Sequence, residues 1–319
     1  LMERSHFLKI VGFGLIAVSL FPSQLIARAN AVKSNFKIIY TNKKLKKELP
    51  IIKANILLKN HTTFRIGGPA KYFLTAKKRE DIIKALKLAG KLNVPFFILG
   101  GGSNILAGDK GFNGLIVKIL EKKPSFKLKK AKNGFLLHAG AGAEIKDLVK
   151  FTANKSLGGL EWAGGLPGTL GGAIRGNAGA FGGETKDSIL EVEAIDHNLK
   201  LRKFSNKECR FSYRSSVFKE KNWIVLSAVL ELEMGNKEVI WKTARANIKY
   251  RKDRHPLELP NAGSIFKNCD YKEFSEPLKK ELAGVVKIDP FPVVPTAYLI
   301  SEAGLKGKKV GGAQVSEKH

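Results

Sequence analysis

Hydrophobic and polar positions alternate along the chain with two different periods. Apolar side chains recur at helical intervals over residues 81–92, and the uninterrupted apolar run 96–99 follows as a strand. Further strands are predicted at 71–76, 135–138, 189–195 and 223–231, and further helices at 144–154, 238–251 and 298–303. Strands and helices are mixed throughout, without a visible repeat. The pattern therefore predicts an α+β fold with at least two subdomains.

The N-terminal segment carries a different pattern. Arg4 and Lys9 precede the apolar run 10–21, and a small-x-small string follows at residues 27–29. This order is typical of a secretory signal. Extended to residue 26, the run is an alternative membrane anchor, although a poor one for a span of about 20 residues. A start assigned upstream of the natural one is the third interpretation, and the lysine-rich residues 30–58 are expected to be a connector.

Composition narrows the classes of function. The chain has 319 residues, of which 44% are hydrophobic, enough for two or three cored units. Its formal net charge of +28 comes mostly from lysines scattered through every segment, without a recognition helix or RNA-binding motif. We therefore expect a solvated basic surface that favours phosphate-bearing small molecules, and no nucleic-acid site. Cys209 and Cys269 lie far apart and the six histidines are dispersed, so neither a metal site nor a disulfide framework is expected.

Glycine gathers in two stretches. The first, Gly100-Gly101-Gly102-Ser103-Asn104, follows the predicted strand 96–99. Its bare N–H groups can curl around a phosphate, although a tight turn also collects glycine. The second, residues 158–183, is neither a P-loop nor a dinucleotide turn, because both of those glycine strings are missing. Two such loops can clasp a long cofactor with a pyrophosphate at its middle.

Six segments in succession resemble the signatures of the UDP-N-acetylenolpyruvoylglucosamine reductase family. They are residues 60–68, 99–104, 166–182, 208–216, 261–268 and 304–319, so the resemblance covers residues 59–319 in the right order. It implies an FAD-binding domain of the PCMH, or vanillyl-alcohol oxidase, type with two subdomains, and a smaller α+β substrate domain. The implied boundaries are 1–58 for the signal-like segment and connector, 59–125 and 126–235 for the two FAD-binding subdomains, and 236–319 for the substrate domain.

The family uses a glutamate near its C-terminus. Glu317 falls too early to be the counterpart of that residue, which implies that the segment carrying the glutamate lies after His319. We therefore expect a C-terminally incomplete substrate domain: either the sequence is a fragment of a longer chain, or its turnover is impaired.

The resemblance also implies the chemistry. The family reduces an enolpyruvyl ether on a UDP-sugar, with NADPH reducing FAD first. Hydride from the flavin then adds to the β-carbon, and a guanidinium stabilises the charge that develops toward the carboxylate. Arg214 matches that catalytic arginine, and Ser264 matches the proton donor for the α-carbon. Without the resemblance, Arg214 is interpreted as a surface ion pair or phosphate clamp, and Ser264 as an ordinary turn serine.

The remaining site residues follow from the same signatures. Substrate contacts are expected at Tyr213, Lys267, Asn268 and Gln314. FAD contacts are expected along the first three signatures, at Arg65, Gly67, Gly100, Gly101, Gly102, Ser103, Asn104, Gly164, Pro167, Gly168, Thr169, Gly171, Gly172, Asn177, Gly179 and Ala180. Covalent flavin attachment at the first glycine loop is disfavoured, because that loop contains no histidine.

These assignments predict NADPH-dependent, FAD-mediated reduction of UDP-N-acetylglucosamine enolpyruvate to UDP-N-acetylmuramate in peptidoglycan precursor synthesis. Two alternatives stay open: another flavin oxidoreductase on the same FAD-binding fold, and a non-catalytic, exported flavin-fold binding protein. Because NADPH and UDP-sugars are cytosolic pools, we expect a cytoplasmic monomer. The signal-like start keeps export, and membrane contact through residues 10–26, open.

Overall fold

The computed structural model describes residues 43–121, 124–288 and 291–318. The predicted signal or anchor at residues 10–26 lies outside these ranges. The chain forms two compact units, residues 1–52 and 53–319, and residues 43–48 of the first are helical. None of the helices in the described ranges has both the length and the apolar character that a membrane span needs.

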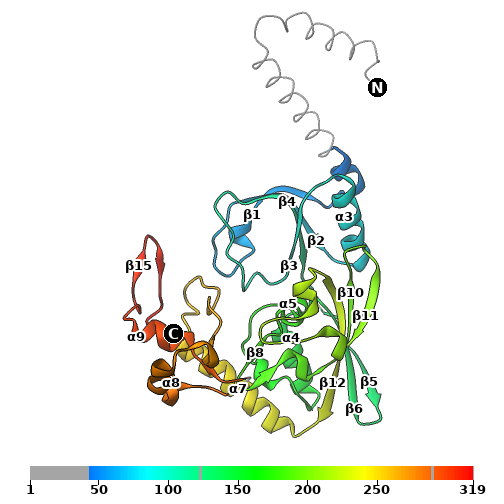
Figure 1. The fold of residues 1–319 in the computed structure, drawn as a ribbon. Coiled ribbons are helices and arrows are strands. Elements are labelled where there is room, and N and C mark those ends of the chain that lie inside the picture. Colours follow the sequence, from blue (N-terminus) through cyan, green and yellow to red (C-terminus); the bar gives the residue numbers. More distant parts are fainter. Residues whose placement is uncertain (1–42, 122–123, 289–290, 319) are drawn as a thin grey trace, which may run out of the picture. The chain divides into compact units, whose positions relative to one another are not determined.

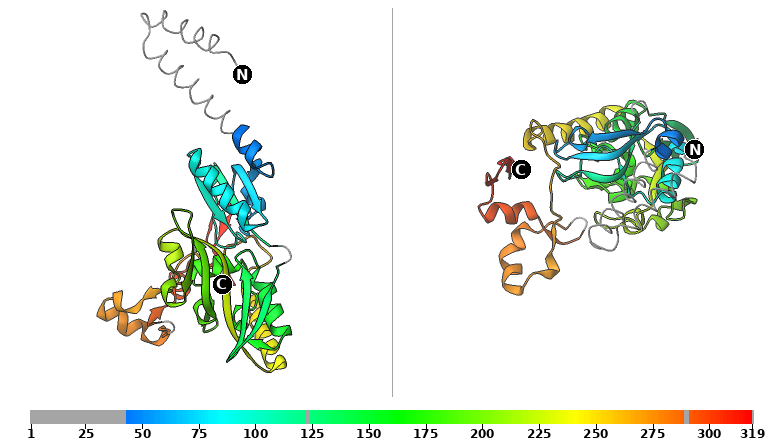
Figure 2. Two further views of the ribbon diagram at one scale, coloured as in Figure 1. Left: turned by 90° about the vertical axis from the view of Figure 1, so that its right-hand side faces the viewer. Right: turned by 90° about the horizontal axis from the view of Figure 1, so that it is seen from above.

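The second unit begins with a four-stranded sheet (Figure 1). Its strands are β1 (Lys53–Leu57), β2 (Pro69–Ala76), β3 (Phe96–Leu99) and β4 (Phe112–Ile119), in the order β1-β2-β4-β3. β1 is antiparallel to β2, and the other two pairings are parallel. Helix α3 (Arg79–Lys91) contacts β2 and β4 and runs beside these strands in the views of Figures 1 and 2.

The strand predicted at 71–76, the helix at 81–92 and the strand at 96–99 are confirmed as β2, α3 and β3. The connector predicted at 30–58 is wrong at its C-terminal end. Residues 53–57 form β1, and Leu58–Asn60 forms a short 3-10 helix. Four of the five β1 side chains are exposed. An edge strand with so little burial carries almost no hydrophobic pattern, which explains why the sequence does not reveal it.

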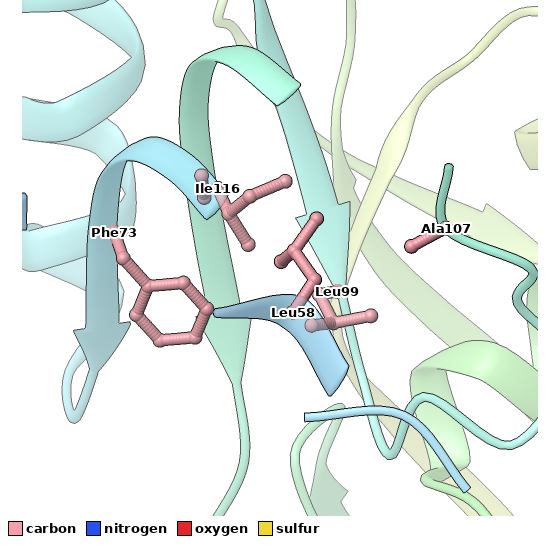
Figure 3. Close-up of a cluster of buried hydrophobic side chains, with 6 residues drawn as sticks. Leu58, Phe73, Leu99, Ala107 and Ile116 are labelled. Atoms are coloured by element: carbon pink, nitrogen blue, oxygen red, sulfur yellow. The ribbon is translucent and has the colours of Figure 1, made fainter. Parts of the chain in front are cut away.

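A buried hydrophobic cluster lies on one face of this sheet (Figure 3). It contains Leu58, Ala70, Phe73, Leu99, Ala107 and Ile116, from β2, β3, β4 and the adjoining segments. Successive strand residues point to opposite faces, so the fully buried Leu74 and Val117 lie on the side of α3. Because Leu99 is the last residue of β3, the cluster fixes the point at which the first glycine loop begins.

A second, six-stranded sheet follows. Its strands are β5 (Lys127–Ala131), β6 (Gly134–Gly140), β7 (Leu157–Gly158), β10 (Ile189–Ile195), β11 (Leu201–Ser205) and β12 (Ile224–Met234). The order is β11-β10-β12-β6-β5, with β7 paired to β12, and every pairing is antiparallel. The helices α4 (Ile145–Asn154) and α7 (Lys237–Arg254) contact each other. The predicted strands at 135–138, 189–195 and 223–231 and the predicted helices at 144–154 and 238–251 are confirmed.

The hydrophobic pattern predicts neither edge strand of this sheet. β5 has the sequence KLKKA and β11 the sequence LRKFS, and most of their side chains are exposed. Charged side chains on an edge strand prevent its pairing with another chain. The charges that protect these edges therefore also hide the strands from a search for apolar alternation. In the four-stranded sheet, the internal strand β4 was not predicted either.

The second glycine stretch contains a helix, which corrects its interpretation as a continuous loop. Helix α5 (Leu170–Gly176) begins after Thr169 and ends at Asn177, which adopts the left-handed conformation with φ 40°. A Cβ on Gly171 would lie 2.8 Å from the Ala141 Cβ. The close contact with the chain after β6 explains why a helix has glycine here, at an intrinsic cost of about 1 kcal/mol per residue.

The last part of the chain is built from short elements. They are α8 (Glu276–Leu282), α9 (Thr296–Glu302), the strand pair β13 (Cys269–Asp270) and β14 (Val293–Val294), and the strand pair β15 (Lys309–Val310) and β16 (Ala313–Gln314). α9 confirms the helix predicted at 298–303. Together with the two sheets, these elements confirm the α+β class. The domain boundaries proposed from the sequence remain a proposal.

Candidate active site

The two glycine stretches contact each other directly. A Cβ on Gly100 would lie 2.5 Å from Thr169 Oγ1, and one on Gly101 would lie 2.9 Å from the Gly168 Cα. The Ser103 hydroxyl donates a hydrogen bond to the Pro167 carbonyl at 3.3 Å. The glycines therefore allow two backbones to approach each other, because any side chain at residue 100 or 101 would push the loops apart.

The first signature packs against the same loop. Gly102 has a φ of +71°, and a Cβ there would overlap the carbonyl oxygen of His61. The Thr63 N–H donates to the Gly102 carbonyl at 3.1 Å. Thr63 also bonds to Asn261 of the fifth signature, because its hydroxyl donates to the Asn261 carbonyl at 2.7 Å. Four signatures far apart in sequence are thus joined by direct contacts.

A half-buried ammonium group lies beside this junction. Lys118 pairs in register with Leu99, and its Nζ lies 3.4 Å from His61 Nδ1. Burial lowers the pKa of Lys118, and Glu144 partly opposes that shift. The pKa of His61 is lowered by burial and by the charges of Lys118 and Lys53. The sequence prediction missed Lys118, since one lysine among many carries no distinguishing signal.

Arg214 is held by the third signature. Its guanidinium donates to the Gly179 carbonyl at 2.9 Å and to the Asn177 carbonyl at 3.5 Å. The guanidinium carbon also lies 5.2 Å from the centre of the Tyr213 ring, a cation–π arrangement. No carboxylate forms an ion pair with Arg214 among the described residues. Its charge is therefore available for an anionic ligand.

Asn177 organises the segment that holds Arg214. The residue is fully buried, and its amide nitrogen donates to Glu184 at 3.1 Å and to the Ser212 carbonyl at 3.2 Å. Its side-chain oxygen accepts from the Lys186 N–H at 3.1 Å. Because these bonds occupy the amide group, the side chain of Asn177 shapes the site rather than offering hydrogen bonds to a cofactor.

The fourth and fifth signatures meet at Tyr213. Its hydroxyl oxygen accepts a hydrogen bond from the Asn268 N–H at 3.2 Å, and the Lys267 Nζ lies 6.0 Å from its ring centre. Lys267 and Asn268, two of the four predicted substrate residues, therefore lie beside a third, Tyr213, whose ring contacts Arg214. Gln314 is not joined to them by a described contact, and its side-chain amide donates to the Gly307 carbonyl at 3.2 Å.

Ser264 lies in an exposed loop, and its hydroxyl makes no hydrogen bond to another described residue. The loop is held at both ends, by the contact of Asn261 with Thr63 and by that of Asn268 with Tyr213. The described contacts do not join Ser264 to Arg214. The ends of its loop nevertheless reach the two sides of the site, the glycine junction and the arginine turn.

The other predicted cofactor residues have mixed surroundings. Gly164 packs on α7, because a Cβ there would lie 2.5 Å from the Ala244 carbonyl oxygen, and Gly67 packs on Ala107. Arg65, Asn104 and Gly172 are exposed, whereas Ala180 is partly exposed. Gly172 has room for a side chain, since its Cβ would lie 3.6 Å from Thr169 Oγ1. Gly67 and Gly164 thus permit close contacts within the protein, whereas Gly172 has space in front of it for a ligand.

Arg251 is a candidate that the sequence prediction missed. Its Nε is buried without a hydrogen-bond partner, and burial lowers the pKa of the guanidinium. The group lies 5.3 Å from the Phe181 ring centre, and a Cβ on Gly165 would lie 2.9 Å from the Arg251 Cδ. Basic residues are common in the last turn of a helix, so nothing in the amino-acid pattern distinguishes Arg251 from its neighbours. A partly buried guanidinium without a carboxylate partner among the described residues suits an anionic ligand.

Two family models match the chain. One, described as an FAD binding domain, covers residues 70–205, and the other, the C-terminal domain of UDP-N-acetylenolpyruvoylglucosamine reductase, covers residues 255–319. The reductase of that name from Caldanaerobacter subterraneus is 39% identical over 262 residues, which are 82% of this chain and 78% of the relative. The chain belongs to the UDP-N-acetylenolpyruvoylglucosamine reductase family.

Other reductases of this family support the assignment. The one from Lachnoclostridium phytofermentans is 36% identical over 272 residues, covering 84% of this chain and 79% of the relative. The crystal structure of the Thermus caldophilus reductase matches with a TM-score of 0.65 and 30% identity, over 83% of this chain and 84% of that one. This family member is an FAD-dependent oxidoreductase, and the expected family, FAD-binding fold and FAD cofactor are confirmed.

The residues of the site fit FAD. The cofactor is anionic because of its pyrophosphate, and Lys118 and Arg251 are buried or half-buried cations close to the glycine segments. Neither forms an ion pair with a carboxylate among the described residues. The glycine junction in addition brings two backbone segments together with no side chain between them at Gly101 and Gly168. Charge and shape thus agree with a bound dinucleotide.

Proposed function

We propose that this family member catalyses the NADPH-dependent reduction of UDP-N-acetylglucosamine enolpyruvate to UDP-N-acetylmuramate, a step of peptidoglycan precursor synthesis. The observation that carries the proposal is the position of Arg214. Its guanidinium is fixed by two backbone carbonyls and has no carboxylate partner among the described residues. It contacts the ring of Tyr213, and the Lys267 ammonium group lies 6.0 Å from the centre of that ring.

The residues divide the proposed work between them. Backbone groups of the glycine junction, with Lys118 and Arg251, hold the FAD. When bound, FAD supplies hydride transfer from NADPH to the β-carbon of the enolpyruvyl double bond. Arg214 binds the substrate carboxylate and stabilises the negative charge that grows as the α-carbon becomes carbanionic. Lys267 adds a second positive charge for the UDP-sugar.

The reaction is completed by a proton. Ser264 donates its hydroxyl proton to the α-carbon and recovers one from water, so that one hydride and one proton have been added across the double bond. Serine is a weak acid, but the carbanion is a strong base, and the transfer is therefore favourable. Because the loop of Ser264 is held only at its ends, we propose that substrate binding brings the hydroxyl to the α-carbon.

Location and assembly are also proposals. NADPH and UDP-sugars are pools of the cytosol, which supports a cytoplasmic enzyme. Every residue in the proposed mechanism comes from one chain, which supports a monomer. Sedimentation of the purified protein tests the second point, and a single species of about twice the mass of 35.0 kDa would contradict it.

A half-reaction experiment tests the activity. The full chain is loaded with FAD, and NADPH is added without oxygen; loss of the visible flavin absorbance is expected. Addition of UDP-N-acetylglucosamine enolpyruvate is then expected to restore the absorbance and to yield the reduced sugar by mass spectrometry. Arg214→Met is the matched variant: we expect it to bleach with NADPH but to recover no colour with the substrate.

The outcomes separate the alternatives. A protein that is bleached by NADPH and recovers its colour with oxygen, but not with the enolpyruvyl substrate, would be a flavin oxidoreductase of another specificity. Recovery of colour in Arg214→Met at the wild-type rate would overturn the role of the guanidinium. A chain that binds FAD but resists NADPH would contradict the proposed reductant.

A further inference from the structure

The turn that carries Arg214 has a strained backbone. The N–H groups of Ser212 and Ser215 donate to each other's carbonyls at 3.1 and 3.0 Å, which leaves Tyr213 and Arg214 as a two-residue turn. Arg214 has a φ of 56°. A left-handed conformation is unfavourable for a residue with a Cβ, and glycine or asparagine usually fills such a turn position. Other interactions must therefore hold Arg214 in this conformation.

Lys219 supplies one of these interactions. Its Nζ donates to the Arg214 carbonyl oxygen at 2.9 Å. Lys219 belongs to the short helix α6 (Val217–Glu220), and the buried Ser216 at the start of that helix donates to the Arg175 carbonyl at 2.8 Å. The lysine therefore extends from an anchored segment. Arg214 is thus held at its carbonyl by Lys219 and at its guanidinium by Gly179.

The groups around Lys219 are mostly positively charged. Partial burial, and then the positive charges of Lys267 and Arg175, lower the pKa of its ammonium group. Among the described residues no carboxylate forms an ion pair with Lys219. Lys219 therefore has other cations as neighbours and donates to the neutral carbonyl oxygen of Arg214. A carboxylate would stabilise its ammonium group more than this carbonyl does.

We propose that Lys219 is a positioning residue for Arg214. By bonding the carbonyl, it stabilises the left-handed turn and so presents the guanidinium in the orientation that binds the substrate carboxylate. The inference rests on the proposed function, because it assumes that Arg214 meets the enolpyruvyl substrate. It predicts that Lys219 acts on substrate binding through Arg214 and leaves FAD binding untouched.

A titration tests the inference. The FAD-loaded full chain is titrated with UDP-N-acetylglucosamine enolpyruvate, and the change in the flavin spectrum gives the dissociation constant. We expect Lys219→Met to weaken substrate binding about tenfold, since a hydrogen bond from a charged group is lost. Lys219→Arg keeps a donor and is expected to recover most of the affinity. Lys221→Met is the matched control, because it removes a lysine two residues away, and it should bind like the wild type.

A double-mutant cycle decides between positioning and direct contact. In an Arg214→Lys background, a positioning role predicts that Lys219→Met causes little further loss, whereas a direct contact with substrate predicts the same loss as before. The FAD dissociation constant and the midpoint of thermal unfolding are measured for every variant. Lys219→Met that binds substrate like the wild type, or that weakens FAD to the same extent, would overturn the inference. A wild-type chain whose spectrum ignores the substrate while it binds FAD would instead overturn the proposed function.

Discussion

The hydroxyl oxygen of Tyr213 accepts a hydrogen bond from the backbone N–H of Asn268 at 3.2 Å, across 55 residues of sequence. The same ring has the guanidinium of Arg214 5.2 Å from its centre and meets Phe291 edge-on at 5.3 Å. One side chain therefore joins the arginine turn to the C-terminal segment that matches the reductase domain.

Replacement of Tyr213 by phenylalanine isolates this hydrogen bond. Tyr213→Phe keeps both ring contacts but leaves the Asn268 N–H without its acceptor, so we expect substrate affinity to fall by about 1 kcal/mol, or roughly fivefold. FAD affinity should not change. Tyr298→Phe, in α9, is the matched control. Equal substrate affinity in wild type and Tyr213→Phe would show that the contact does not shape the site.

A methyl group at Gly101 is expected to separate the two glycine segments. The added Cβ would lie 2.9 Å from the Gly168 Cα, and backbone cannot rotate away as a side chain can. We expect Gly101→Ala to raise the FAD dissociation constant by about tenfold or more, which corresponds to roughly 1.4 kcal/mol. Gly90→Ala, in α3 and outside the predicted FAD contacts, adds a Cβ with no atom within 4 Å and should bind FAD as the wild type does. Fluorescence quenching of FAD measures both, and equal affinities would contradict a role for the loop contact.

Asn177 is expected to control stability through two separable effects. Asn177→Ala removes three hydrogen bonds of a fully buried side chain and forces alanine to a φ of 40°, so we expect a loss of about 2–4 kcal/mol. Asn177→Gly tolerates the left-handed backbone and should recover about 1 kcal/mol of that loss. Urea unfolding of both variants gives the difference. If the glycine variant is the less stable one, the strain explanation is wrong.

The role of Arg251 can be tested by removal of its charge. Arg251→Met keeps an apolar chain against Phe181 but removes a partly buried cation, and we expect FAD to bind about tenfold more weakly. The variant should also be at least as resistant to urea without FAD, because the unpaired buried charge costs free energy. Lys252→Met changes the adjacent, exposed residue and serves as the control. Unaltered FAD binding in Arg251→Met would assign Arg251 to packing alone.

The two cysteines should differ in reactivity. Cys209 is fully buried, and burial, with a smaller contribution from Glu208, raises the pKa of its thiol from 9.0 to about 12. The folded state therefore keeps this proton above pH 9, whereas the unfolded chain loses it. Stability should consequently decrease as the pH rises from 9 towards 12, by up to about 1.4 kcal/mol per pH unit from this group.

Thiol titration checks this difference. At pH 8 a chromogenic disulfide should modify the partly exposed Cys269 and leave Cys209 intact until the protein is unfolded. Cys209→Ala should show a smaller decrease in the urea midpoint between pH 8 and pH 10 than the wild type. Rapid modification of both thiols in the folded chain would contradict the burial of Cys209.

The amino-acid pattern alone is enough to predict the strongly periodic elements, the glycine stretches and the family signatures. The helix at residues 81–92 and the strand at 189–195 could be predicted because each buries one face, and burial leaves a repeating apolar pattern. Elements without that pattern were missed. The edge strands β5 and β11 are charged, and α5 is hidden among glycines.

The contacts between distant residues became apparent only in the folded chain. The fold places Gly101 against Gly168 and Tyr213 against Asn268. It buries Asn177, whose side chain forms hydrogen bonds with several segments. It also places Arg251 beside the second glycine stretch, without a carboxylate partner among the described residues. It also revealed the bond from Lys219 to the Arg214 carbonyl. The physical reason is that apolar periodicity reports how one segment is buried. Contacts between distant segments depend on how the whole chain packs, and a lysine or arginine that makes such a contact resembles every other basic residue in the sequence.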